Sequence, residues 1–256
     1  MKRYLRALGM CFSMFCAIPM PFRCWEEDDR PLMTLFLPAV GLFTGGLWAA
    51  MGWGMWKLGL PGALRAAVMC AFPYLVTGFM HLDGFLDVTD AVKSWRALEK
   101  RREILKDPHV GSFAVAAAGI LLILGFGAFS AMTDTPCYLG LAAVSAVSRA
   151  CAGLAVTVLP PMSESQYAGG YQAGVRKGHI AYFCAAILLA LMGGFLLNGW
   201  PGGIAAAAAA AGFAAALRRA FSSLKGMSGD IAGYAITVAE LCGAAAYAVF
   251  GAGFAG

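Results

Sequence analysis

Charged side chains are scarce in this sequence. Only 13% of its 256 residues are Asp, Glu, Lys or Arg, about half the share of a typical soluble domain. This scarcity excludes a disordered chain, a basic nucleic-acid-binding tail and an ordinary soluble enzyme. The sequence is instead 60% hydrophobic, with a mean hydropathy of +0.71. It therefore predicts a polytopic membrane protein whose net charge of +5 belongs to its loops, with no nucleic-acid partner.

Cysteine pairing motifs are also missing. None of the eight cysteines forms a C-x-x-C pair, and most lie in apolar stretches. We therefore expect small buried hydrophobic residues in a reducing compartment, not a disulfide framework.

Long apolar runs dominate the chain. Seven of them approach the roughly 17–25 residues that a membrane-spanning helix needs: 34–56, 63–80, 112–132, 138–159, 180–198, 203–221 and 231–253. Residues 4–18 form a shorter run before Pro19, and we predict an interfacial or re-entrant helix there. The fold class predicted is all-α: one integral membrane domain over residues 1–256, built as a transmembrane helical bundle of about seven spans.

Basic residues indicate the orientation. Residues 81–111 carry six Lys or Arg residues, and a seven-span bundle places the N-terminus, 160–179 and 222–230 on the same side. The opposite side receives only Lys57 and Arg65. Because cytoplasmic loops are enriched in Lys and Arg, we predict a cytoplasmic loop at 81–111.

Three aspartates open this segment, in the run His81-Leu-Asp83-Gly84-Phe-Leu-Asp87-Val-Thr-Asp90. The spacing i, i+4, i+7 places the carboxylates on one helix face, where they repel each other. Such a face is expected where a divalent cation such as Mg²⁺ neutralises it. The alternative is a solvated acidic face with no ligand.

Two further segments have the composition of anion sites. Lys106, Asp107 and His109 precede Gly111-Ser112 at the predicted start of the 112–132 span, and Gly229-Asp230 opens the last span. Helix N-termini bind phosphate through free backbone N–H groups. The alternative is an ordinary basic anchor followed by a helix cap.

Arg149 lies in the middle of a predicted span, where an unpaired arginine costs roughly 2.5–3.5 kcal/mol on insertion scales. Two explanations remain open: an ion pair with Glu240 of the last span, or binding of an anionic substrate group.

These segments together resemble the cobalamin synthase family, adenosylcobinamide-GDP ribazoletransferase. The run from His81 to Asp90 resembles the H-L-D-G-x-x-D-x-x-D signature, and Lys106 to Phe113 resembles the K-D-x-x-x-G-S-[FY] block. Ser148-Arg149 and residues 226–230 are similar to later blocks. The matches run in order over most of the chain. Departures from common family residues occur at Ala91, His109, Ala114 and Met227, and none removes a carboxylate.

The resemblance implies that adenosylcobinamide-GDP reacts with α-ribazole, or its 5′-phosphate, to give adenosylcobalamin, or its phosphate, and GMP. It implies Mg²⁺, a location in the bacterial inner membrane, cytoplasmic active-site loops, and 81–111 as the catalytic loop. It is compatible with a homo-oligomer and with association with other cobalamin-assembly enzymes. The implied catalytic residues are Asp83, Asp87, Asp90, Lys106 and Asp107. The implied metal ligands are Asp83, Asp87, Asp90, Asp107 and Asp230. The implied substrate-binding residues are His81, Gly84, His109, Gly111, Ser112, Arg149, Gly229 and Asp230.

Two other functions compete with this prediction. CDP-alcohol phosphotransferases of lipid synthesis also bind metal through helical aspartates, but their D-G-x-x-A-R pattern is absent here. A secondary transporter would place its functional charges near the midplane and would show inverted repeats, which the sequence lacks.

Overall fold

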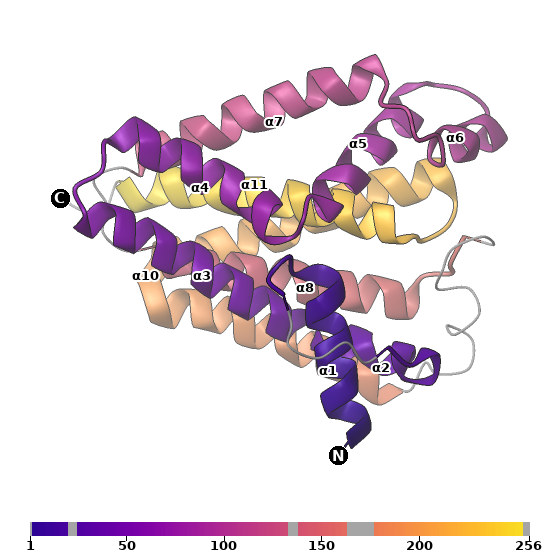
Figure 1. Cartoon of the computed structure of the whole chain (residues 1–256), viewed down its shortest axis with the longest axis horizontal. Helices are drawn as coiled ribbons and strands as arrows, with labels where there is room; N and C mark the ends of the chain where they lie inside the picture. Colours follow the sequence, from indigo (N-terminus) through magenta and orange to yellow (C-terminus); the bar gives the residue numbers. More distant parts are fainter. Residues whose placement is uncertain (1, 20–24, 133–137, 163–176, 253–256) are drawn as a thin grey trace.

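Helices make up almost all of the described chain (Figure 1). The computed structural model describes residues 2–19, 25–132, 138–162 and 177–252, and these residues contain no β-strand apart from one isolated bridge between Pro161 and Met227. The all-α prediction is confirmed. The longer elements are α1 (Lys2–Phe15), α3 (Leu37–Lys57), α4 (Gly62–Val76), α5 (Met80–Lys93), α6 (Leu98–Ile104), α7 (Ser112–Ala131), α8 (Gly140–Val158), α10 (Lys177–Leu224) and α11 (Gly229–Ala252), and the short helices η1 (Glu27–Asp29), α2 (Arg30–Met33) and η2 (Thr34–Phe36) lead into α3.

Five helices are long and apolar enough to cross a bilayer, or six if the bent pair α4–α5 counts as one span. The chain is thus a multi-pass membrane protein by length and composition. One of the five, α10, has 48 residues and would reach about 72 Å if straight, over twice the thickness of the hydrocarbon core. Its backbone leaves helical geometry at Asn198 and Gly199, and Gly202 packs so closely on the Gly194 carbonyl that no Cβ fits between them. Two arms of α10 therefore meet at this break.

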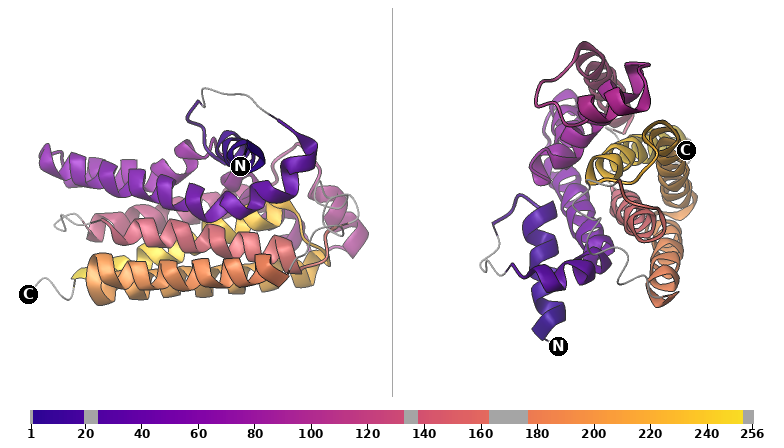
Figure 2. Two further views of the ribbon diagram at one scale, coloured as in Figure 1. Left: turned by 90° about the horizontal axis from the view of Figure 1, so that it is seen from below. Right: turned by 90° about the vertical axis from the view of Figure 1, so that its right-hand side faces the viewer.

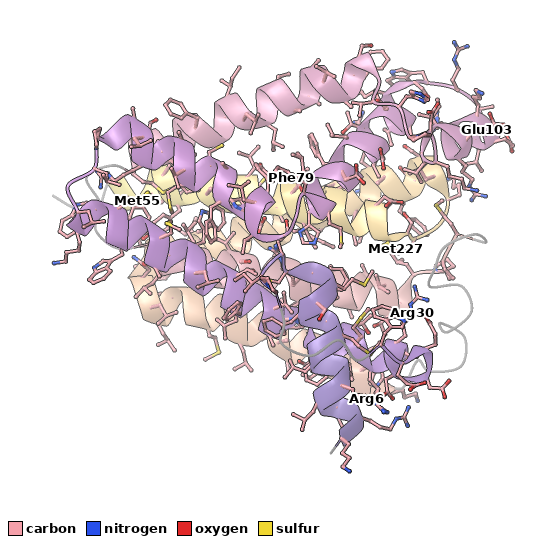
Figure 3. All side chains as sticks on the ribbon, in the orientation of Figure 1. Arg6, Arg30, Met55, Phe79, Glu103 and Met227 are labelled. Atoms are coloured by element: carbon pink, nitrogen blue, oxygen red, sulfur yellow. The ribbon has the colours of Figure 1, made fainter. Side chains whose placement is uncertain are left out.

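The chain bends by 89° between α4 and α5. Gly78 and Phe79 both adopt left-handed backbone angles there, with φ of 59° and 64°, and Phe79 is labelled at the bend in Figure 3. Residues 81–93, predicted as the start of a loop, are instead helical, and α5 packs against α11 and α7. This bend turns the acidic motif back onto the bundle.

Helix α1 lies across the bundle instead of running along it (Figure 2). Its 14 residues are not among the candidate spans. Arg3 and Arg6 form ion pairs with the fully buried Asp29, at 2.6 and 2.7 Å. On its other face, Met10 packs with Met33 and neighbouring residues at the start of α3. These contacts fix α1 against η1, α2 and the start of α3.

Small residues hold the centre of the bundle together around α8, whose span is 83% buried. A Cβ on Gly45 of α3 would lie 2.7 Å from the Ser145 Cβ of α8, so glycine at this position lets the two helices approach closely. On the other side, Ala205, Ala206 and Ala209 of α10 are fully buried. The bundle therefore forms a rigid support for α5 and for the start of α11.

Candidate active site

The structure brings three predicted aspartates together. Asp83 and Asp87 lie one turn apart on α5, and Asp230 lies in the first turn of α11. A Cβ on Gly84 would come within 2.7 Å of the Asp230 carbonyl oxygen, so glycine at this position lets the two helices touch. Gly84 therefore has a packing role where the resemblance implied substrate binding. We call Asp83, Asp87 and Asp230 the acidic face.

The acidic face has an excess of negative charge. The carboxylate of Asp87 is half-buried and is repelled by those of Asp83, Asp230 and Asp90. Among the described residues, neither Asp83 nor Asp87 forms an ion pair or a side-chain hydrogen bond, and Asp230 accepts a hydrogen bond from the Ser228 hydroxyl, 3.3 Å away. Because like charges facing each other are unfavourable, this arrangement favours a bound cation or cationic group.

The hydrogen bonds of Asp90 give it a role different from the cation binding suggested for the acidic face. It is buried, and its Oδ2 and Oδ1 accept the backbone N–H groups of Gly111 and Ala114, at 2.5 and 2.9 Å. The carboxylate thus caps the start of α7, where unpaired N–H groups and the helix dipole attract negative charge. The amide of Gly111, predicted to bind phosphate, is occupied by Asp90. Ser112 at the same helix start stays exposed.

The segment before α7 is exposed. Lys106, Asp107 and His109 all face solvent. Asp107 accepts hydrogen bonds from the backbone N–H and from the ring Nδ1 of His109, at 3.0 and 2.7 Å. These hydrogen bonds hold the pKa of Asp107 below its usual value. Its electrostatic partners are His109 and Lys100, not the acidic face.

No preformed metal cage is visible. In the described ranges, no group of three or more His, Cys, Asp or Glu side chains is arranged to hold a metal ion. The five-carboxylate ligand set implied by the resemblance is therefore not assembled. Asp90 serves as a helix cap and Asp107 pairs with His109, which leaves the acidic face as the remaining candidate.

Arg149 is part of a buried polar network. It forms an ion pair with Glu240 and donates to Ser145 and Ser148 at 2.9 and 3.1 Å. The Nδ1 atom of His81 lies 3.4 Å from Nη2 of Arg149. The ion pair, one of the two explanations left open by the sequence, is the one the structure contains. Nη1 and Nη2 of the guanidinium have partners within the protein, whereas Nε has none among the described residues. Contact with substrate stays a prediction.

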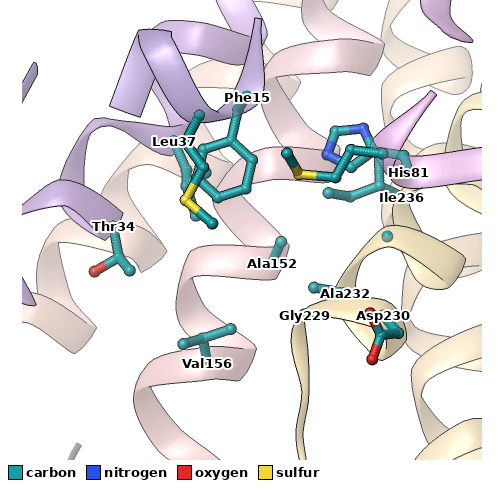
Figure 4. A pocket seen from close by; sticks show the side chains of 13 residues that line it. Phe15, Thr34, Leu37, His81, Ala152, Val156, Gly229, Asp230, Ala232 and Ile236 are labelled. Carbon is teal, nitrogen blue, oxygen red and sulfur yellow. The ribbon is translucent and has the colours of Figure 1, made fainter. Parts of the chain in front are cut away.

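A pocket adjoins the acidic face (Figure 4). His81 and Asp230 contribute to its wall, and α1 supplies Met14 and Phe15. Sequence reasoning missed these two α1 residues because it treated the N-terminal helix only as a membrane-surface element. The complete lining is Met14, Phe15, Thr34, Leu37, Met80, His81, Ala152, Val156, Gly229, Asp230, Ala232, Gly233 and Ile236.

Comparison with known proteins decides the family. A family model described as cobalamin-5-phosphate synthase matches residues 7–248. The chain belongs to the cobalamin-5-phosphate synthase family. Several proteins named adenosylcobinamide-GDP ribazoletransferase are similar over most of their length. The one from Clostridium perfringens (strain 13 / Type A) is 34% identical, with 95% of this chain and 97% of the relative covered. The one from Lachnoclostridium phytofermentans is 30% identical, with 93% and 92% covered. No solved structure matches.

Membership of the cobalamin-5-phosphate synthase family confirms the resemblance read from the motifs. The structure adds which motif residues meet. Asp83, Asp87 and Asp230 share the acidic face, His81 and Gly229 line the adjoining pocket, and Asp107 lies apart.

Proposed function

We propose that this chain joins adenosylcobinamide-GDP to α-ribazole, or to α-ribazole 5′-phosphate, and releases GMP. An acceptor hydroxyl oxygen attacks the phosphorus on the cobinamide side of the diphosphate. The bond from that phosphorus to the bridging oxygen breaks, and GMP leaves. A carboxylate of the acidic face accepts the hydroxyl proton. The observation that carries the proposal is the family match over residues 7–248, together with whole-length relatives that bear this enzyme name.

The acidic face fits a magnesium-bound diphosphate. Mg²⁺ usually binds one or two carboxylates, several waters and substrate phosphate oxygens, and it seldom uses an all-protein cage. Asp83 and Asp87 have no cationic partner among the described residues, and Asp230 lies beside them. One or two carboxylates of the acidic face, together with phosphate oxygens and water, would hold Mg²⁺, which would neutralise the charge that builds on the leaving phosphate.

The protein's own residues account for the placement of the acidic face. The bend at Gly78–Phe79 aims α5 at the start of α11, and Gly84 permits their contact. Asp90 fixes the start of α7 beside α5 through Gly111 and Ala114. The aspartates are thereby held on packed helices and not on a flexible loop, which favours precise positioning of a phosphate.

We further propose seven crossings of the bacterial inner membrane: α3, the bent pair α4–α5, α7, α8, the two arms of α10, and α11. The end of the bundle that carries α6 holds most of the basic residues, and the end with the α3–α4 turn holds Lys57 and Arg65 (Figure 1). The α6 end therefore faces the cytoplasm. Helix α1, amphipathic and crosswise, lies in the cytoplasmic interface.

A turnover assay tests the proposed activity. The purified protein in nanodiscs is incubated with adenosylcobinamide-GDP, α-ribazole and Mg²⁺, and cobalamin and GMP are followed by chromatography. We expect both products in equal amounts, and no product when EDTA removes Mg²⁺. α-Ribazole 5′-phosphate, run in parallel, shows which acceptor is preferred.

The control is Lys57→Gln, a change in the end of the bundle opposite α6, which should turn over like the wild type. Folded protein that gives no product with either acceptor would contradict the proposal. Product formation from a CDP-alcohol and a hydroxyl acceptor would support lipid phosphotransfer, and substrate uptake into proteoliposomes without chemistry would support transport.

A further inference from the structure

The pocket beside the acidic face is mostly apolar. Three of the residues that line it have polar side chains: Thr34, His81 and Asp230. The Thr34 hydroxyl already donates to the Pro31 carbonyl at 3.1 Å within its own turn. Asp230 belongs to the acidic face. His81 is therefore the one neutral polar side chain of the lining that can serve a ligand.

The hydrogen bonding of His81 identifies which ring nitrogen carries the proton. Its Nδ1 lies 3.4 Å from the guanidinium of Arg149, and a guanidinium can only donate. Nδ1 is thus the acceptor, and the ring hydrogen of a neutral imidazole sits on Nε2. The imidazole lies at the pocket wall (Figure 4), nearly parallel to the ring of Phe15, with 25° between the ring planes. The pocket therefore presents one hydrogen-bond donor in aromatic surroundings.

We propose that this pocket binds the base of the acceptor nucleoside and selects an apolar benzimidazole over a purine. The inference rests on the proposed function. A benzimidazole linked through one nitrogen has a single remaining acceptor, which His81 satisfies. Its ring packs against Phe15 and the thioether of Met14, contacts that favour flat aromatic groups.

A purine base fits this lining poorly. Adenine and guanine carry several donors and acceptors on their edges, and each group buried without a partner costs affinity. The location is also suitable, because Asp230 belongs both to the pocket and to the acidic face. A nucleoside whose base occupies the pocket would extend its ribose toward the reacting diphosphate.

Competition between two acceptors tests this selectivity. Steady-state kinetics with saturating adenosylcobinamide-GDP would compare the α-linked 5,6-dimethylbenzimidazole nucleoside with the α-linked adenine nucleoside. We expect kcat/KM to be at least about tenfold higher for the benzimidazole acceptor, the loss that one unpaired buried polar group produces. Equal values, or a preference for adenine, would overturn the inference.

Phe15→Ala tests the location. Loss of its ring should raise KM for the benzimidazole acceptor about fivefold to tenfold, while KM for adenosylcobinamide-GDP stays within about twofold. Phe12→Ala is the matched control, because Phe12 lies on the same helix but packs edge-on against Phe43, 5.3 Å away, outside the pocket lining. It should leave both KM values unchanged.

The outcomes separate the two proposals. Wild-type enzyme that makes cobalamin but shows no dependence on Phe15, or that loses adenosylcobinamide-GDP affinity instead, contradicts the pocket assignment and leaves the activity intact. Absence of all turnover contradicts the activity itself. Should Phe15→Ala fail to fold, the comparison of acceptors on the wild-type enzyme still decides.

Discussion

Two groups of charged residues in this bundle differ in whether a partner of opposite charge neutralises them. Arg149 and Glu240 are almost completely buried, with side-chain exposures of 2% and 7%, and each finds its partner in the other. Asp83 and Asp87 lie at the junction of α5 and α11, and the charged groups that act on Asp87 are the carboxylates of Asp83, Asp230 and Asp90. We call Arg149 and Glu240, which neutralise each other, the closed pair. We call Asp83 and Asp87, whose negative charge is not neutralised, the open group.

This difference distinguishes charged residues that stabilise the fold from charged residues that are candidates for binding a ligand. A buried charge in a membrane bundle survives only when it is paired, because its desolvation is otherwise uncompensated. Carboxylates that repel each other do not stabilise the fold, so their gathering at one place favours a role in binding a cation. The comparison therefore places Arg149 among the residues that stabilise the bundle and makes Asp83 and Asp87 candidates for cation binding.

Breaking the closed pair should have the largest effect on stability. Arg149→Ala leaves Glu240 buried without a cation, and we expect a loss of about 3–5 kcal/mol in unfolding free energy. Thermal unfolding in detergent measures it. The double change Arg149→Met with Glu240→Leu is the control and should recover most of the loss. A single variant as stable as the wild type would show that the pair is not structural.

Removing charge from the open group should have the opposite signature. Asp83→Asn and Asp87→Asn should lower kcat by about 100-fold, while thermal stability stays equal or rises because repulsion with neighbouring carboxylates falls. Turnover across a Mg²⁺ titration measures the effect. Wild-type turnover at limiting Mg²⁺ in Asp83→Asn would remove this residue from the metal site.

Asp90→Asn tests whether Asp90 stabilises the fold or belongs to the metal site. An amide retains one acceptor oxygen, so one of the two N–H groups at the start of α7 loses its partner. We expect a loss of about 1 kcal/mol in stability and a smaller fall in activity than for Asp83→Asn. A variant of unchanged stability that has lost its Mg²⁺-dependent turnover would return Asp90 to the metal site.

The positions of the helices were readable from the sequence because hydropathy alone determines them. The predicted spans agree with α3, α7, α8 and α11 within a few residues, and the break near residue 198 separates two predicted spans. The 89° bend was not readable. It depends on left-handed angles at Gly78 and at Phe79, a residue type that seldom adopts them.

The site was only partly readable, for a physical reason. Local spacing placed Asp83, Asp87 and Asp90 on one helix face, but it did not show that Asp90 accepts N–H groups more than 20 residues away. The same limit applies to the pocket, where Phe15 meets His81 across most of the N-terminal third of the chain. Motifs identify which residues belong to a site, while long-range packing decides what each one does.

Asp107 provides the finest test of the comparison, because the motif includes it and the structure places it apart. Its pKa is lowered by hydrogen bonds from His109, so it stays ionised at neutral pH, exposed to solvent. An exposed carboxylate paired with a neighbour contributes little. Asp107→Asn should therefore change kcat by less than about twofold, with Glu103→Gln on α6 as the exposed control. A fall of tenfold or more, at unchanged stability, would mean that residues 105–111 close over the acidic face when substrate binds. Asp107 would then join Asp83 and Asp87 only during turnover.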